Sequence, residues 1–484
     1  MESNNRSKTY KGISIQTFIT ITLGVLGILY FAVMSRLLSK TDFGYFAIIT
    51  AVTSILTSLS EAGLGSAVIQ SRNSSKSFVQ TAWTLSFILG SIFCILLFCF
   101  ADFLSTIMVG SDVLSLGYRI MSFSLILYAV NGVGRAVIIK KLNFLKYGVF
   151  DIVAYTLSSI VGVYLAYNGY GFYAVVVAML LHQTFLGVQI IISIRDILSI
   201  KIQKNYVREI INYGGWLTSS VIVRNITDQA DKLITTHWIS VPLLGAYNRP
   251  TGLIYQITGN INGIFDTILF PILSGINDDP KKIVSAYEKS VSLIILFSII
   301  LSTGFILASE LIISIFLGEE WLYLANIFEI VSLVIVFLSY NRLADCFFRS
   351  IGIVKTYFMS RCYILVCTCV SIYLGCQFGI VGLAIGLVVS KIAAVIIKII
   401  LLTPYIPLKR FSFYKESLKS WGVPLILFFV CYIIKKSMPF GNFVSIVLFV
   451  SILGIICCAR PQLLGSIFYE NLYLVVVNKL RKNK

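Results

Sequence analysis

The sequence predicts an all-α integral membrane protein with about 14 transmembrane helices. Of its 484 residues, 57% are hydrophobic and only 12% are charged, whereas soluble proteins carry about 25% charged residues. The mean hydropathy is +0.90. Because a helix needs about 20 apolar residues to cross a membrane, this composition leaves room for many spans and excludes a large soluble domain.

Apolar runs separated by short polar stretches give the predicted spans. The first run begins near Ile13 and is longer than the apolar core of a signal peptide, so no cleavable signal is expected. The predicted spans are 13–34, 43–69, 78–101, 112–134, 147–167, 171–194, 209–236, 244–272, 284–309, 322–347, 356–375, 380–402, 420–435 and 441–459.

The net charge of +18 is mostly a topology signal, because cytoplasmic loops of membrane proteins are enriched in Lys and Arg. With the N-terminus in the cytoplasm, the predicted inner loops and both ends hold 29 of these cations. The outer loops hold only Arg36, Lys40, Lys435 and Lys436. Both termini are therefore expected in the cytoplasm. Nucleic-acid binding is not expected, because it needs a soluble basic surface.

Two pairs of similar segments indicate an internal repeat of about 200 residues. Residues 38–46 resemble 239–247, and 168–171 resemble 376–379. Each repeat holds six spans, so an axis along the membrane normal should relate them, with substrate bound at their interface. The predicted organisation is a cytoplasmic N-terminus (1–12), two six-helix lobes (13–200 and 201–405), two additional helices (406–462) and a cytoplasmic tail (463–484).

Ionisable residues within predicted spans are the candidate functional residues, because such groups are costly in a membrane unless they pair or face water. The seventh span holds Arg224, Asp228, Asp231 and Lys232, whose spacing places all four on one helical face. Two interpretations stay open. The four residues form either a polar wall of a central cavity or a neutralised structural network, with Arg224 paired to Asp228 and Asp228 to Lys232.

Further cations lie in or beside other spans, namely Arg119, Arg249, Arg342 and Lys391. Several cations in both repeats suit a cavity that accepts an anion, and phosphate is the natural candidate because Arg presents paired planar donors. Glu61 lies inside the second span, next to glycines. It either carries a coupling H⁺ or Na⁺ or caps a helix break.

No enzyme motif stands out. The sequence has no phosphate-binding GxxxxGK[ST] loop, HExxH or GxSxG. Its ten cysteines form no CxxC pair, and there are only two histidines, His182 and His237, so neither a metal site nor a cofactor is expected. The short outer loops disfavour a membrane polysaccharide polymerase or ligase. Transport remains the favoured class.

The order and spacing of several segments resemble a known family. These segments are Ser35–Gly44, Glu61–Gln70, Tyr213–Trp216, Arg224–Asn225, Gln229–Ile234 and Gly245–Arg249. Over about residues 10–460, the chain resembles the polysaccharide transporter branch of the multidrug/oligosaccharidyl-lipid/polysaccharide (MOP) exporter superfamily. The resemblance is greatest to its Wzx-type flippases.

The resemblance implies two six-helix lobes around a central cavity, with two extra helices. It implies alternating-access flipping of an undecaprenyl-diphosphate-linked oligosaccharide, of O-antigen, colanic acid or capsule type, across the bacterial cytoplasmic (inner) membrane. The expected partners are this polyprenyl-diphosphate-linked oligosaccharide, membrane lipids, a polysaccharide polymerase and a chain-length regulator. The candidate diphosphate-binding residues are Arg224, Arg249, Arg342, Arg119 and Lys391; those for coupling to H⁺ or Na⁺, or for charge balance, are Glu61, Asp228, Asp231 and Lys232.

The main alternative is a cation-coupled multidrug antiporter of the same superfamily. That function usually places an Asp in the first span, and no carboxylate lies between Ile13 and Met34.

Overall fold

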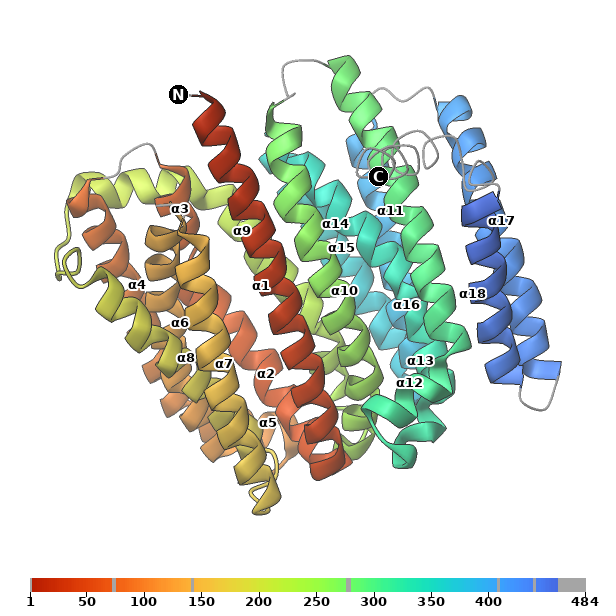
Figure 1. Ribbon diagram of the computed structural model, residues 1–484. Helices are drawn as coiled ribbons and strands as arrows, with labels where there is room; N and C mark the ends of the chain where they lie inside the picture. The colour runs from red at the N-terminus through yellow and green to blue at the C-terminus, as the bar shows by residue number, and fades with distance from the viewer. Residues whose placement is uncertain are drawn as a thin grey trace. The chain divides into compact units, whose positions relative to one another are not determined.

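The computed structural model describes residues 2–71, 75–140, 143–275, 280–406, 410–437 and 441–459. Within these ranges all regular structure is helical (Figure 1), which confirms the predicted all-α class. The helices up to residue 194 are α1 (Glu2–Leu37), α2 (Lys40–Glu61), α3 (Leu64–Gln70), α4 (Lys76–Cys99), α5 (Ala101–Val109), α6 (Ser115–Lys140), α7 (Phe144–Tyr167) and α8 (Tyr173–Ile194). A short 3-10 helix, η1 (Asp112–Leu114), precedes α6.

The later helices are α9 (Lys204–Thr235), α10 (Val241–Gly275), α11 (Pro280–Leu307), α12 (Ser309–Phe316), α13 (Ala325–Ser332), α14 (Val334–Ser350), α15 (Val354–Cys376), α16 (Gly379–Leu402), α17 (Arg410–Ser437) and α18 (Gly441–Ala459). A second 3-10 helix, η2 (Glu319–Leu324), follows α12.

Ten segments of the described chain are long and apolar enough to cross a membrane, so the protein is a multi-pass membrane protein. The other four predicted spans coincide with α9, α10, α17 and α18, which do not meet those limits over their described residues. The total of about 14 spans therefore stays a prediction.

Two compact units make up the chain. One comprises residues 1–260 with 361–383, and the other comprises 261–360 with 384–484. The predicted division into lobes near residue 200 stays a prediction.

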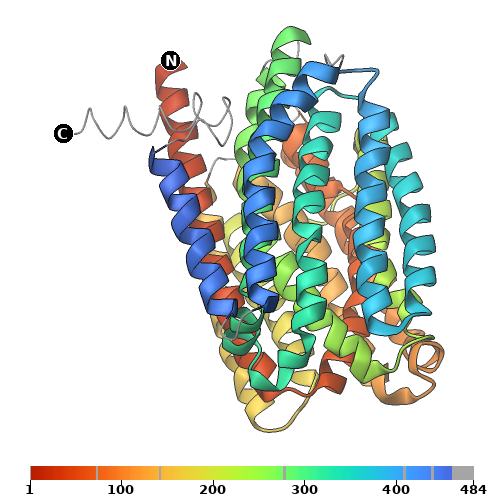
Figure 2. The ribbon, with the colours of Figure 1, turned by 90° about the vertical axis from the view of Figure 1, so that its right-hand side faces the viewer.

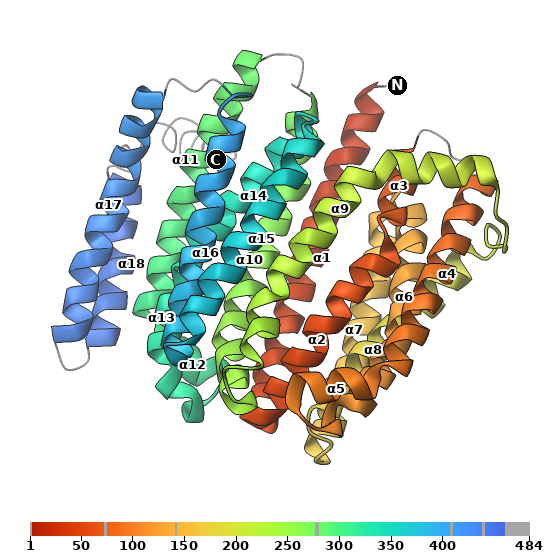
Figure 3. The same cartoon turned by 180° about the vertical axis from the view of Figure 1, so that it is seen from behind.

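In the first unit, α6 packs between α4 and α8, while α7 packs against both α1 and α8 (Figure 3). Small side chains let these helices approach closely. A Cβ atom at Gly134 would overlap the Ile190 side chain, and one at Gly148 would overlap Ile19. Close backbone approach at small residues is a common basis of helix association in membranes, where lipid gives little hydrophobic driving force.

The second predicted span breaks between α2 and α3. Ala62 ends α2 with φ 42°, and Gly63 precedes α3 with φ 68°, both in the left-handed region that glycine tolerates and alanine disfavours. No side chain caps α3. The helix break expected at the glycines is thus present, but the structure gives no support for Glu61 as its cap.

In the second unit, α11 packs against α14 and α17, and α17 pairs with α18. Figure 2 shows α17 and α18 in blue, running side by side. They fall within residues 406–462, and that they are two additional transmembrane helices stays a prediction.

Candidate functional site

Arg249 lies on α10 in the first unit, and its side chain is only 6% exposed. Its guanidinium carbon lies 3.1 Å from the centre of the Phe43 ring and 4.1 Å from that of Phe31. These cation–π contacts stabilise the charge without satisfying its N–H groups.

The Arg249 guanidinium has unused donors. Its Nε and Nη2 atoms are buried and have no hydrogen-bond partner among the described residues. The Tyr30 hydroxyl, close enough to Arg249 to interact electrostatically, also lacks a partner. Because an unpaired buried donor costs about 1–3 kcal/mol, and more when it is charged, this arrangement is suited to an anion that enters from outside the protein.

Asp231 on α9 is buried and firmly held. Its Oδ2 accepts a hydrogen bond of 3.1 Å from the Tyr247 hydroxyl, and its Oδ1 accepts one of 2.9 Å from the Lys232 amide. The Lys232 Nζ donates to Gln229 Oε1 over 2.9 Å. Asp231 therefore joins α9 to α10 through Tyr247, the last residue of the segment 239–247 that resembles residues 38–46.

The other charges of α9 lie in different environments. Asp228 is exposed, and Arg224 is partly exposed. Arg224 makes no hydrogen bond or ion pair with the described residues. The predicted pairing of Arg224 with Asp228 is thus not observed, and Lys232 hydrogen-bonds to Gln229 instead of forming a close ion pair with Asp228. Whether this face of α9 lines a cavity stays a prediction.

Glu61, at the end of α2, is partly buried. Its carboxylate lies near Gly132 of α6, and the Arg135 guanidinium is close enough to attract it. Arg119 lies in a different environment from these groups. It is 42% exposed and forms an ion pair of 2.7 Å with Asp102 in the first turn of α5, so the structure does not bring it to Arg249.

Two of the candidate diphosphate-binding residues, Arg342 and Lys391, belong to the second unit. Arg342 on α14 is exposed, and Lys391 on α16 is buried. Beside them, Lys398 and Asp345 form a buried ion pair of 2.7 Å, and Lys398 Nζ also donates to the Asn341 carbonyl over 2.9 Å.

A second buried ion pair was missed by sequence reasoning. Lys435, counted above with the outer-loop cations, lies within α17 and its side chain is 2% exposed. Its Nζ contacts Glu329 Oε1 at 2.6 Å, Ile306 O at 2.7 Å and Ser309 Oγ at 2.8 Å. The charge near a helix end looked like a topology signal, because nothing local indicates a partner about 100 residues away.

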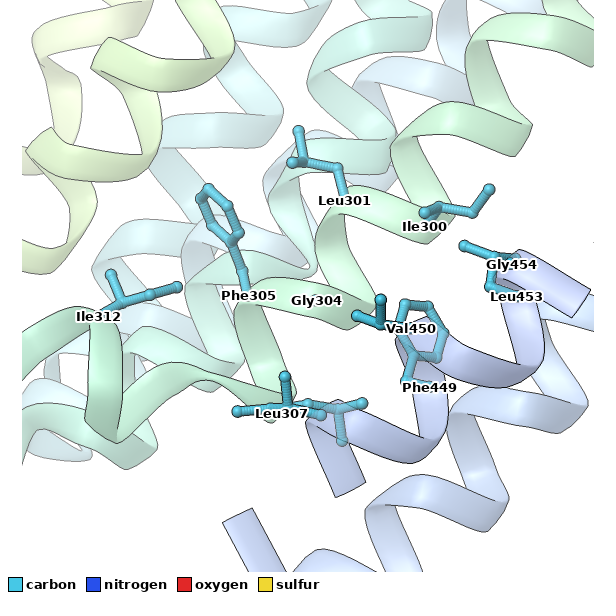
Figure 4. A pocket seen from close by; sticks show the side chains of 11 residues that line it. Ile300, Leu301, Gly304, Phe305, Leu307, Ile312, Phe449, Val450, Leu453 and Gly454 are labelled. Carbon is cyan, nitrogen blue, oxygen red and sulfur yellow. The ribbon is translucent and has the colours of Figure 1, made fainter. Parts of the chain in front are cut away.

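An apolar cavity of about 540 Å³ lies between α11 and α18 (Figure 4). Ile300, Gly304, Phe305, Phe449 and Leu453 are among its lining residues. No charged side chain lines it, so its chemistry suits a hydrocarbon chain and not a sugar or an ion.

No group of three or more His, Cys, Asp or Glu side chains that could hold a metal ion occurs in the part of the chain that the structure describes.

The fold is similar to those of two solved transport proteins. The structure superimposes on lipid II flippase MurJ in an inward closed conformation with a TM-score of 0.74 and 18% identity, covering 95% of this chain and 99% of that one. It also superimposes on an inward-facing multidrug resistance MATE family transporter, with a TM-score of 0.66, 15% identity, and 84% and 99% coverage.

The chain belongs to the polysaccharide biosynthesis protein family, whose model matches residues 33–326. It is 21% identical to lipopolysaccharide biosynthesis protein WzxC of Escherichia coli (strain K12), over 65% of this chain and 64% of that protein. It is 22% identical to succinoglycan biosynthesis transport protein ExoT of Rhizobium meliloti (strain 1021), over 60% and 59%. The matches thus span just under two thirds of these relatives.

Proposed function

We propose that this protein is a transporter, not an enzyme, that flips a polyprenyl-diphosphate-linked oligosaccharide across the bacterial cytoplasmic membrane by alternating access. The family match and the relatives named for lipopolysaccharide and succinoglycan biosynthesis support a polysaccharide precursor as cargo. The likeness to a lipid II flippase supports a fold able to move a large lipid-linked molecule.

The unpaired guanidinium of Arg249 is the observation on which the proposal depends. A diphosphate offers several anionic oxygens, and Arg binds such groups through paired N–H donors. The two free nitrogen atoms, Nε and Nη2, would donate to it, while Phe31 and Phe43 hold the guanidinium plane. Arg224 is the second candidate, because it too makes no ion pair with the described residues.

The lipid portion needs an apolar environment. The cavity between α11 and α18 supplies one, and we assign it to part of the polyprenyl tail. The sugars, being polar, would instead move through a water-filled path between the repeats, as in other transporters built from repeats.

Coupling to an H⁺ or Na⁺ gradient is part of the proposal. Asp231 and Glu61 are its acidic candidates on the first unit, with Asp228 and Lys232 balancing charge. Asp231 is buried, as a coupling carboxylate in a membrane would be.

Deletion of the gene in its own host tests the function. Surface polysaccharide should disappear while lipid-linked single units accumulate, and the intact gene on a plasmid should restore the polymer. Normal surface polymer in a strain without a second flippase would overturn the proposal. Unchanged polymer with increased drug sensitivity would instead favour a multidrug antiporter.

A further inference from the structure

A His–Asp pair that the candidate site above does not include lies inside the first unit. His182 Nε2 of α8 lies 3.0 Å from Asp151 Oδ1 of α7. Their side chains are 21% and 19% exposed, so the pair is largely buried but partly accessible. Both helices are membrane-spanning candidates, and each residue lies at least seven positions from its helix ends, or about 10 Å.

The surrounding hydrogen bonds indicate which imidazole nitrogen holds the proton. The Gln183 Nε2 amide lies 3.4 Å from His182 Nδ1, so we assign the tautomer in which Nδ1 accepts from this amide. Nε2 then holds the hydrogen and donates it to Asp151. In this state the imidazole is neutral, and Nδ1 is the position at which a second proton can be added.

The Gln183 side chain can adjust to that second proton. Its Oε1 accepts a 3.2 Å hydrogen bond from Asn131 Nδ2, but Asn131 also donates to the Gln183 main-chain oxygen over 2.9 Å. If the Gln183 amide rotates, its oxygen can accept from protonated Nδ1. Asn131 stays anchored through the main chain.

With a neutral imidazole, the Asp151–His182 pair carries one negative charge. Glu61 of α2 and Arg135 of α6 attract one another. Glu61 and Asp151 are both close enough to interact electrostatically with Tyr128 of α6 and Tyr147 of α7. Tyr155 of α7 packs its ring edge against His182, and Tyr30 of α1 packs against Tyr155. The charged groups next to these tyrosines are Glu61, Arg135 and, beside Tyr30, Arg249 of α10. Asp151 and a neutral His182 by themselves sum to −1.

A net negative charge inside a membrane is costly unless a cation compensates it. A hard metal cation such as Na⁺ prefers several oxygen ligands, whereas here the carboxylate already accepts from an imidazole N–H. A proton on Nδ1 brings the sum to zero without displacing that bond. His is also the side chain that most readily changes charge near neutral pH.

We propose that Asp151 and His182 form an intramembrane proton-binding site. One H⁺ adds to His182 Nδ1, no covalent bond breaks, and the imidazolium remains hydrogen-bonded to Asp151 through Nε2. The use of this site to couple flipping to the proton gradient rests on the proposed function; the binding of the proton itself does not.

Histidine nitrogen NMR of the purified, substrate-free protein tests proton binding. Because the chain has only two histidines, His237→Gln leaves His182 as the single ¹⁵N-labelled histidine. Between pH 8 and pH 5 its signals should change reversibly from the neutral Nε2–H form to imidazolium. A ring that stays neutral, or stays imidazolium, across this range would overturn the proposal.

A matched pair of variants tests the role of the carboxylate. Asp151→Asn should move the midpoint of the His182 transition to lower pH by about one unit or more, because the opposite charge that favours imidazolium is gone. Asp196→Asn removes an exposed carboxylate paired with Arg195 and should leave the midpoint unchanged. Equal midpoints in the His237→Gln protein and in its Asp151→Asn and Asp196→Asn variants would overturn the proposal.

A cell assay then distinguishes a role of His182 in proton coupling from a purely structural role. Gln at position 182 can still donate to Asp151 but cannot take up a proton. His182→Gln should therefore insert at the wild-type level, yet export at least tenfold less polysaccharide. Export at the wild-type rate with unchanged sensitivity to a protonophore would overturn coupling at this site. The gene-deletion result is independent of it, so failure of either proposal is recognised separately.

Discussion

Gly44 of α2 and Gly245 of α10 lie at a close approach of the two helices. A Cβ atom at Gly44 would overlap the Val241 carbonyl oxygen, and one at Gly245 would overlap the Lys40 carbonyl oxygen. Val241 follows Lys40 by 201 residues, as Gly245 follows Gly44. The contact is therefore reciprocal, as expected where two repeats meet around an axis.

This contact predicts that Gly245→Ala destabilises the protein. The added methyl group meets backbone atoms that cannot rotate away, so the helices must separate, at a cost of about 1–3 kcal/mol. Thermal unfolding of the purified protein in detergent measures the loss. Gly259→Ala is the matched control on the same helix, since no atom lies within 4 Å of its Cβ position; it should be neutral or slightly stabilising. Equal stability of the two variants would contradict the prediction.

Asp231→Asn should give a protein that inserts normally but exports at least tenfold less polysaccharide. The amide oxygen still accepts from the Tyr247 hydroxyl, so the link between α9 and α10 is kept while the charge is lost. Tyr247→Phe is the converse control. It removes one hydrogen bond, worth about 1 kcal/mol, keeps the carboxylate, and should retain export. Full export by Asp231→Asn would remove this residue from the mechanism.

The Lys435–Glu329 pair predicts a non-additive effect on stability. Lys435→Met leaves a buried carboxylate without its partner, which costs about 3–5 kcal/mol, whereas an apolar replacement of both partners is often neutral. The double variant Lys435→Met with Glu329→Leu should therefore unfold near the wild-type temperature. Lys436→Met, at an exposed neighbour, is the control. Additive losses would show that the pair is not coupled.

The orientation in the membrane predicts labelling from one side only. In a cysteine-free background, a cysteine at Glu319, which is exposed in η2, should react with an impermeant maleimide on intact spheroplasts. A cysteine at Arg410, where α17 begins, should react only after the membrane is permeabilised. The reverse pattern would place both termini outside.

Helix positions were predictable from sequence because the apolar runs are local. The run at 43–69 and its glycines indicated the break that the structure places at Ala62 and Gly63. The repeat segments also anticipated equivalent helix starts at Lys40 and Val241.

Pairing between distant side chains was not predictable. The Asp151–His182 pair joins residues 31 apart on two helices, and no periodicity indicates that they face each other. Lys435 resembled a topology signal, although it is buried against Glu329. Asp231 is buried whereas Asp228 is exposed, and their shared place on the charged face of α9 did not indicate this difference.

The central claim is that the protein moves a diphosphate-linked oligosaccharide between leaflets and that Arg249 binds the diphosphate. The most direct measurement is the fraction of lipid-linked repeat units that an impermeant lectin reaches on spheroplasts of a polymerase-deficient strain. Wild type should expose most units, whereas Arg249→Gln, inserted at the same level, should expose at least tenfold fewer. Arg119→Gln, at an exposed ion pair, should behave as wild type. Equal exposure of the units in the Arg249→Gln and wild-type strains would contradict the account.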